Sequence, residues 1–369
     1  MLYYNITFCF HSIAREGEAV QVLRTLTLGS GLGLALLLMA TGAQSAEAPR
    51  LVTTLPPIHS LVAAVAEGAT TPHLLLRGGT SPHTYTMAPS DARTLQNADL
   101  VVWVGPSVET FMVRALRDPR PGRRVLTLKE GAGVIVLETR KGGIFETHDH
   151  DRVERHNHDA DHAHADEHDH DEDHAHDDVH DHKEEHGHQD KPVHDAHVDG
   201  HLWLDPKNAL RIVELTAEAL IELDPGRAAI YRANAARAAE RLSRLDAELA
   251  TILNPVKDHS FIVFHDAYQY FERRYGLTVA GSITVAADRK PGARRLREIR
   301  DRLTNAGAAC VFAEPQFPPD VVATVVEGTG ARKGTADPLG AALEPGPDLY
   351  PTLMRELARS LAECLSPQS

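Results

Sequence analysis

Cysteine, aromatic residues and long apolar runs are all scarce in this chain. Among 369 residues there are three cysteines, and aromatic side chains make up 5%. No local cysteine and histidine spacing of the zinc-finger kind occurs, and neither does a His-Glu-x-x-His sequence. The apolar stretch at residues 26–39 is short and broken by glycines. These absences argue against a zinc-finger module, a metallopeptidase helix and an obvious membrane span.

Acidic charge is concentrated in one segment. The formal net charge is −14, but residues 146–199 alone hold 20 acidic side chains against four basic ones. The rest of the chain is therefore close to neutral and offers no field that would favour nucleic acid or an anionic membrane surface. Together with 42% hydrophobic residues, this is typical of a soluble globular protein with neither of those partners.

The N-terminus has the pattern of an export signal. Arg24 precedes the apolar stretch at 26–39, and small residues follow at 41–46. We expect cleavage between Ser45 and Pro49, with an uncleaved membrane anchor as the alternative. Residues before about Val20 resemble extra sequence upstream of a conventional signal. Residues 1–48 are therefore left out of the predicted fold.

Two cysteines remain after the signal is removed, because Cys9 leaves with it. Cys310 and Cys364 form an even pair in an oxidising compartment, which suggests one disulfide. Two buried, unpaired thiols are the alternative.

From residue 50 onward, short apolar runs alternate with amphipathic stretches, which predicts α/β lobes with mainly parallel sheets flanked by helices. The expected order is an N-terminal lobe at 49–206, a helical connection at 207–254 and a C-terminal lobe at 255–369. Within the first lobe, residues of about 141–199 are rich in His, Asp and Glu and almost free of apolar side chains. We expect this segment to be a disordered insertion.

One helix of the connection is long enough to join two lobes. It is expected to open at Pro225, with Asp224 as its cap, and to run to about Leu253. Its apolar stripe is expected to include Ile230, Leu242, Leu245 and Leu249. At ~1.5 Å per residue such a helix spans roughly 42 Å.

Three histidines outside the insertion stand in unusual positions. His83 follows the apolar run at 74–76, and His265 directly follows the apolar run at 261–264. His201 lies where the chain re-enters the fold after the insertion, and Asp337 follows a plausible strand. Loops at the carboxyl ends of strands are where open α/β sheets bind ligands, and three imidazoles with one carboxylate would suit four-coordinate Zn²⁺. Taken singly, each histidine is better explained as a structural residue, and spacing alone does not establish a shared site.

The insertion is itself a candidate metal binder. It holds 16 histidines, including the pairs His162/His164, His168/His170 and His180/His182. Neutral imidazole is the commonest protein metal ligand. Without a fixed geometry we expect several weakly bound ions and no selection for zinc.

Several motifs occur in the order found in a known family. They are Ser81-Pro82-His83-Thr84-Tyr85 with Pro89-Ser90-Asp91, Asn97-Ala98-Asp99-Leu100-Val101-Val102-Trp103-Val104-Gly105, His201-Leu202-Trp203-Leu204-Asp205-Pro206, Phe264-His265-Asp266-Ala267-Tyr268 with Tyr270-Phe271, Phe312-Ala313-Glu314-Pro315-Gln316-Phe317, and Asp337-Pro338-Leu339-Gly340. From about Leu51 to Cys364 the chain resembles the zinc-specific, ZnuA-type periplasmic solute-binding proteins of ABC importers, in cluster A-I.

This resemblance implies a fold, a site and partners. The fold is two α/β lobes joined by one long rigid interlobe helix, with Zn²⁺ in the cleft between them. The implied ligands are His83, His201 and His265, with Asp337 or water in the fourth position, because Pro82 stands where some zinc-binding members have a glutamate. The resemblance also implies a disulfide in the second lobe, consistent with Cys310 and Cys364. Related manganese receptors place a carboxylate at the position of His265, which favours zinc here.

The expected function is therefore a high-affinity periplasmic zinc receptor, monomeric and not an enzyme. It would deliver Zn²⁺ to a membrane permease with its cytoplasmic ATPase. Three alternatives remain: a metal-storage protein or adhesin that uses the insertion, a manganese receptor, and a secreted zinc hydrolase with Asp266 as a base. Glu314 is expected to be a structural carboxylate or one that supports a ligand, and not a ligand itself, and His59 is expected to be a capping or packing residue.

Overall fold

The computed structural model describes residues 47–140, 145, 197–284, 291–305 and 307–367. The predicted export signal and most of the predicted insertion lie outside these residues. Among the described helices, none has both the length and the apolar character needed to cross a bilayer.

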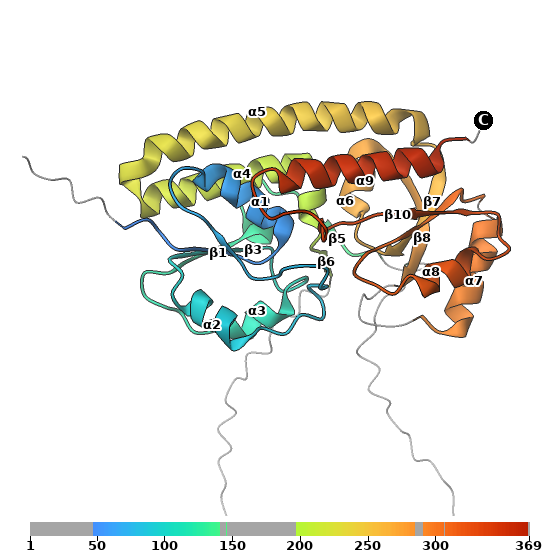
Figure 1. Ribbon diagram of the computed structural model, residues 1–369, viewed down its shortest axis with the longest axis horizontal. Helices are drawn as coiled ribbons and strands as arrows, with labels where there is room; N and C mark the ends of the chain where they lie inside the picture. Colours follow the sequence, from blue (N-terminus) through green and yellow to red (C-terminus); the bar gives the residue numbers. More distant parts are fainter. Residues whose placement is uncertain (1–46, 141–144, 146–196, 285–290, 306, 368–369) are drawn as a thin grey trace, which may run out of the picture. The chain divides into compact units, whose positions relative to one another are not determined.

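Two parallel four-stranded sheets form the two lobes (Figure 1). The first sheet has the order β2-β1-β3-β4 and the second has the order β10-β9-β7-β8, with all neighbours parallel. The strands of the first are β1 (Leu51–Thr53), β2 (His73–Leu74), β3 (Leu100–Trp103) and β4 (Arg124–Thr127). Those of the second are β7 (Ser260–His265), β8 (Thr278–Thr284), β9 (Cys310–Ala313) and β10 (Arg332–Thr335). The predicted fold class, two parallel α/β lobes with flanking helices, is confirmed.

A short antiparallel ribbon, β5 (Leu137–Glu138) with β6 (Val198–Asp199), brackets the predicted insertion. Leu137 pairs with Asp199 and Glu138 with Val198. The last two residues assigned to the insertion thus form a strand, and His201 follows that strand by two positions.

Helices cover both faces of each sheet. They are α1 (Pro56–Ala66), α2 (Pro89–Gln96), α3 (Thr110–Ala115), α4 (Pro206–Leu223), α5 (Ala228–Leu253), α6 (Gln269–Tyr275), α7 (Ala293–Asn305), α8 (Asp320–Val326) and α9 (Leu349–Leu365). Single 3₁₀ turns occur at η1 (Leu128–Glu130), η2 (Leu202–Leu204), η3 (Pro225–Arg227) and η4 (Asn254–Val256). In Figure 1, α5 extends above both sheets, with α1 and α4 beneath one half and α9 beneath the other.

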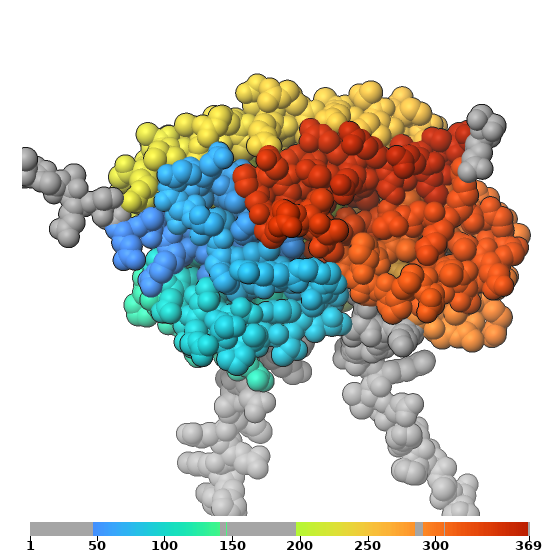
Figure 2. All heavy atoms as spheres, viewed as in Figure 1, coloured from blue at the N-terminus to red at the C-terminus, as the bar shows by residue number. Residues whose placement is uncertain are grey.

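Alternation along the strands assigns side chains to the two faces of a sheet. In β7, Phe261 and Val263 face the core under α5 and α9, whereas Ile262 and Phe264 face α7 and α8. This is the period-two pattern of a strand that is buried on both faces. The core under α5 is continuous, because one hydrophobic cluster includes Leu51 and Leu100 of the first sheet together with Phe261 and Phe312 of the second. On the face shown in Figure 2, the blue-to-cyan and orange-to-red parts of the chain meet directly below α5.

The long interlobe helix is present and opens at Pro225 as expected, with one correction to its apolar stripe. Pro225 begins the 3₁₀ turn η3, with Asp224 at the cap position, and η3 continues without a break into α5 at Ala228. Ile230 was expected in the apolar stripe but is exposed, while its neighbour Tyr231 is fully buried. Tyr231 lies on the same helical face as Ala238, Leu242, Leu245 and Leu249. Each residue of an α-helix is rotated by about 100° from the one before it, so Ile230 points away from that face.

Candidate metal centre

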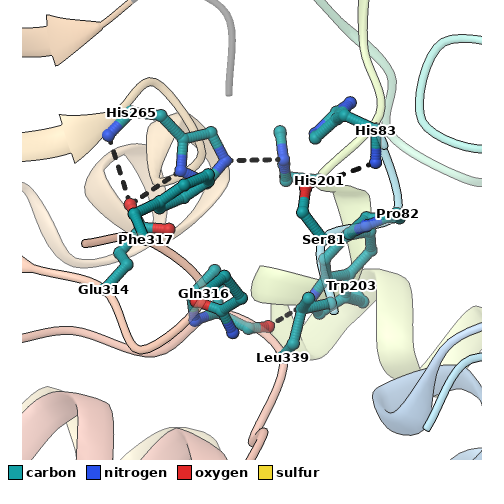
Figure 3. Close-up of a pocket in the computed structure, with 11 residues that line it drawn as sticks. Ser81, Pro82, His83, His201, Trp203, His265, Glu314, Gln316, Phe317 and Leu339 are labelled. Carbon is teal, nitrogen blue, oxygen red and sulfur yellow. Dashed lines mark hydrogen bonds and ion pairs between the residues drawn. The ribbon is translucent and has the colours of Figure 1, made fainter. Parts of the chain in front are cut away.

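The structure brings His83, His201 and His265 together from three separate parts of the chain. One nitrogen from each ring can be chosen so that all three lie within 4.8 Å of one another. The Nε2 atoms of His201 and His265 are 3.3 Å apart. Two nitrogens that are both about 2.0–2.1 Å from Zn²⁺ at a tetrahedral angle would be separated by roughly 3.3 Å. The spacing of this pair therefore fits a shared ion, and Figure 3 shows the three rings converging on one small pocket.

His265 occupies the position in the second sheet where the chain reverses its winding direction. It is the last residue of β7, which lies between β8 and β9, and Glu314 directly follows β9. Such a switch point leaves a crevice at the carboxyl ends of the two strands. The Nδ1–H of His265 donates a hydrogen bond to Glu314 Oε1 at 2.7 Å, and the backbone N–H donates to the same oxygen at 3.2 Å. These bonds fix the ring with Nε2 directed at the pocket.

His201 is oriented in the same way by Asp199. The Nδ1–H of His201 donates to Asp199 Oδ1 at 2.8 Å, and its backbone N–H donates to that oxygen at 3.0 Å. Trp203 lies against the ring and donates its indole N–H to the carbonyl oxygen of Pro338 at 2.8 Å. Carboxylates that accept from Nδ1 leave Nε2 as the free lone pair and raise the basicity of the ligand.

Gly200 allows this turn to pack closely against the first lobe. A Cβ at this position would lie 2.3 Å from Val108 Cγ2 and 2.6 Å from Ser107 Oγ. A Cβ contact shorter than 3.0 Å forces the neighbouring atoms apart, so a larger residue here would displace the turn that carries Asp199 and His201. Glycine is therefore required here by close approach.

His83 lies on a loop from the first lobe and is half-buried, whereas His201 and His265 are buried. Its ring centroid is 5.8 Å from that of His201 and 6.0 Å from that of His265. Burial, together with the two neighbouring imidazoles, lowers the pKa of His83 well below its usual value. This ring is neutral at pH 7 and ready to bind a cation.

The pKa of His265 moves the other way. Burial works against its protonation, but the negative charge and hydrogen bond of Glu314 outweigh that effect and raise the pKa. His265 therefore keeps its proton up to a higher pH than an ordinary histidine does. A metal ion must displace that proton in order to bind.

Asp337 lies beside the pocket, outside the three-histidine cluster. Its carboxylate accepts hydrogen bonds from Gln316 Nε2 at 2.8 Å, from the backbone N–H of Leu339 at 3.0 Å and from that of Ala341 at 2.7 Å. These bonds hold the loop that contributes Pro338 and Leu339 to the pocket wall. To bind the ion, Asp337 would have to give up part of this network.

Two other carboxylates and one further histidine have defined places. Asp266 is paired with Arg140 and is not available as a free base next to His265. His59 is buried in α1, where its Nε2 lies 3.2 Å from the carbonyl oxygen of Pro72, so it packs within the first lobe. Asp199 was not singled out from the sequence. The signal for it was its position two residues before His201, and this was obscured by the acidic segment that it ends.

The model of the family described as "Zinc-uptake complex component A periplasmic" matches residues 51–364. The chain belongs to the ZnuA family. The high-affinity zinc uptake system protein ZnuA of Brucella suis is 47% identical over 320 residues, covering 87% of this chain and 92% of that protein. ZnuA of Paracoccus denitrificans is 42% identical over 342 residues, covering 92% of this chain and 98% of that protein.

Solved structures share the ZnuA-type fold. The crystal structure of a ZnuA is 23% identical, covers 87% of this chain and all of that chain, and gives a TM-score of 0.64. The periplasmic zinc-binding protein TroA from Treponema pallidum is 20% identical, with 87% and 100% coverage and a TM-score of 0.64. The family match and the shared fold confirm the family and the fold expected from the sequence. Members of the ZnuA family are periplasmic solute-binding receptors.

Proposed function

We propose that this chain is the zinc-binding receptor of an ABC importer, held in the periplasm after a signal at 1–48 is removed. His83, His201 and His265 bind the ion, which is cargo and not a catalyst. The loaded monomer then docks on a membrane permease that is driven by a cytoplasmic ATPase. The observation that carries this proposal is the convergence of three imidazoles, two of them oriented by buried carboxylates.

The donor set supports zinc over manganese. Imidazole nitrogen suits zinc, whereas manganese prefers oxygen ligands. The described residues that could hold an ion together are three histidines, and the carboxylates of Asp199 and Glu314 each use one oxygen to accept from Nδ1 of a ring. Membership of a zinc-uptake family points the same way.

The test is a calorimetric zinc titration of the exported chain beside a variant lacking residues 147–195. The deletion stops short of β6, because Val198 pairs with Glu138 and Asp199 holds His201. We expect one tight zinc site in both proteins and additional weak sites in the full chain alone. Loss of the tight site on deletion would move metal binding into the insertion and favour storage. A receptor also predicts that the zinc-loaded protein shows no esterase, peptidase or hydratase turnover.

We predict that lowering the pH weakens zinc binding at the tight site, because protons compete with zinc for His265. Zinc needs the neutral ring, and the raised pKa of His265 means that its proton begins to compete at a higher pH than usual. Because burial lowers the pKa of His83, a proton competes for this ring only at a lower pH than for His265. Below the pKa of His265, affinity should fall by at least about 10-fold per pH unit.

This dependence can be measured by chelator competition between pH 8 and pH 5.5 in the 147–195 deletion variant. Glu314→Gln is the control, because it removes the charge that raises the pKa of His265 and should move the onset to lower pH. An affinity that is constant over this range would contradict the assignment of His265.

We predict that Asp337→Ala weakens zinc binding by less than about 10-fold, because its carboxylate is engaged by three hydrogen bonds in its own loop and water can complete the zinc shell. The same change should lower the melting temperature, since two backbone N–H groups lose their acceptor. A loss of affinity comparable to that of a histidine variant would show that Asp337 is the fourth ligand.

A further inference from the structure

Arg140 joins the first part of the chain to the loop that carries His265. It lies two residues beyond β5, and its guanidinium contacts Asp266 and Glu272, more than 120 positions later in the chain. Its Nη1 and Nη2 donate to the two oxygens of Glu272 at 2.7 and 2.9 Å. Its Nε donates to Asp266 Oδ2 at 3.1 Å, and Nη2 also bonds to Asp266. One guanidinium therefore binds two carboxylates, and each carboxylate accepts from two of its nitrogens.

A tyrosine continues this contact to His201. The hydroxyl of Tyr270, on α6, accepts from the backbone N–H of Leu137 at 2.9 Å and donates to the carbonyl oxygen of Asp199 at 2.6 Å. Both strands of the β5–β6 ribbon are thus attached to α6. Asp199 in turn holds His201, and Asp266 is the immediate neighbour of His265. The segments that carry two of the three histidines meet at one set of contacts.

These contacts are largely shielded from solvent. The side chains of Arg140, Asp266 and Glu272 are 20%, 14% and 10% exposed. Two carboxylates this close together repel each other unless a cation lies between them, and a partly buried pair is screened little by salt. The far end of α6 is fixed separately, by Arg274 Nε, which donates to Asp246 of α5 at 2.9 Å. Loss of the Arg140 contact would therefore loosen the loop between β7 and α6 while α6 itself stays docked.

We propose that Arg140 is a positioning residue for zinc, which holds the His265 loop against the β5–β6 ribbon so that Nε2 of His265 stays at binding distance from Nε2 of His201. This inference rests on the proposed receptor function. The sign of the effect separates positioning from simple electrostatics. A positive charge near a cation site weakens binding, so its removal alone would tighten zinc binding, whereas loss of positioning weakens it.

The test compares Arg140→Lys with the wild-type full chain. Lysine keeps the charge but cannot form the planar, forked contacts with two carboxylates. Arg355→Lys is the matched control, because Arg355 pairs with Glu248 between α9 and α5 at 2.9 Å, in the helical layer and not among the residues of the pocket. Each protein is loaded with one equivalent of zinc, and the rate of zinc transfer to a chromophoric chelator is measured. One equivalent of cobalt is then used to record the visible absorption spectrum, which reports ligand geometry.

We expect zinc to dissociate about 10-fold faster from Arg140→Lys, with an altered cobalt spectrum, and the control to match the wild type in both. Arg140→Met should also release zinc faster than the wild type, despite the lost charge. Wild-type rates and spectrum in Arg140→Lys, or slower release from Arg140→Met, would overturn this inference. If His265→Ala abolishes the tight site while Arg140→Lys changes nothing, this inference alone fails. If the wild type has no tight site, the receptor function fails with it.

Discussion

Replacement of His265 by alanine should lower zinc affinity by about three orders of magnitude, which is roughly 4 kcal/mol of binding free energy. The change removes one of three imidazoles that meet within 4.8 Å, and it leaves Glu314 without the ring that donates to it. Zinc in a protein site is usually four-coordinate, and water replaces a lost nitrogen ligand poorly. The measurement is zinc competition against a high-affinity chelator, using the 147–195 deletion variant as the parent protein.

His73→Ala is the matched control, because this half-exposed histidine lies in β2 outside the cluster. Its zinc affinity should stay within about 3-fold of the parent value, which is within the ordinary range for a surface substitution. Melting curves of the metal-free proteins check that His265→Ala is folded. A folded variant with full affinity would refute the proposed site.

Removal of the disulfide should produce the largest loss of stability. Cys310 at the start of β9 is bonded to Cys364 in α9, with 6.2 Å between their Cα atoms and 54 positions between them in the chain. Closing a loop of that length restricts the unfolded chain by about 4 kcal/mol in the chain-entropy model. We expect the Cys310→Ala/Cys364→Ala protein to lose about that much free energy of unfolding.

Denaturant titration of the metal-free proteins measures this difference, with the wild type in reducing buffer as a second comparison. Zinc affinity of the folded double variant should change little, since the bond lies at the start of β9 and Glu314 follows its end. An unchanged midpoint of unfolding would mean that the bond contributes no net stability.

Much of the fold was predictable from hydrophobic patterning, and the exceptions have physical reasons. The continuously apolar runs at 261–264 and 309–313 predict strands, and both strands are present. β8 was not expected, because Thr278–Thr284 contains small and polar residues and Gly281, although four of its seven residues are buried. Ile230 was misassigned because a helical stripe is decided by phase, and its more buried neighbour Tyr231 sets that phase.

The convergence of the three histidines was predictable, but the side chains that surround them were less so. His83, His201 and His265 each stand at a visible break between an apolar run and a loop. The hydrogen bonds of Glu314 and Arg140 join positions 49 and 132 residues apart, and no local pattern encodes which partners meet. Likewise, nothing in the sequence around Asp337 shows that its carboxylate is engaged by Gln316 and two backbone amides. Its expected role as fourth ligand stays a prediction.

The unbroken hydrophobic cluster under α5 has a consequence for cooperativity. Leu51 and Phe261 belong to different sheets, yet they lie in one core with α1, α4, α5 and α9. A shared core couples the unfolding of the two lobes, because unfolding either one would expose apolar surface of the other to water. We therefore expect a packing defect in this core, even one far from the three histidines, to lower the folded fraction of both lobes together.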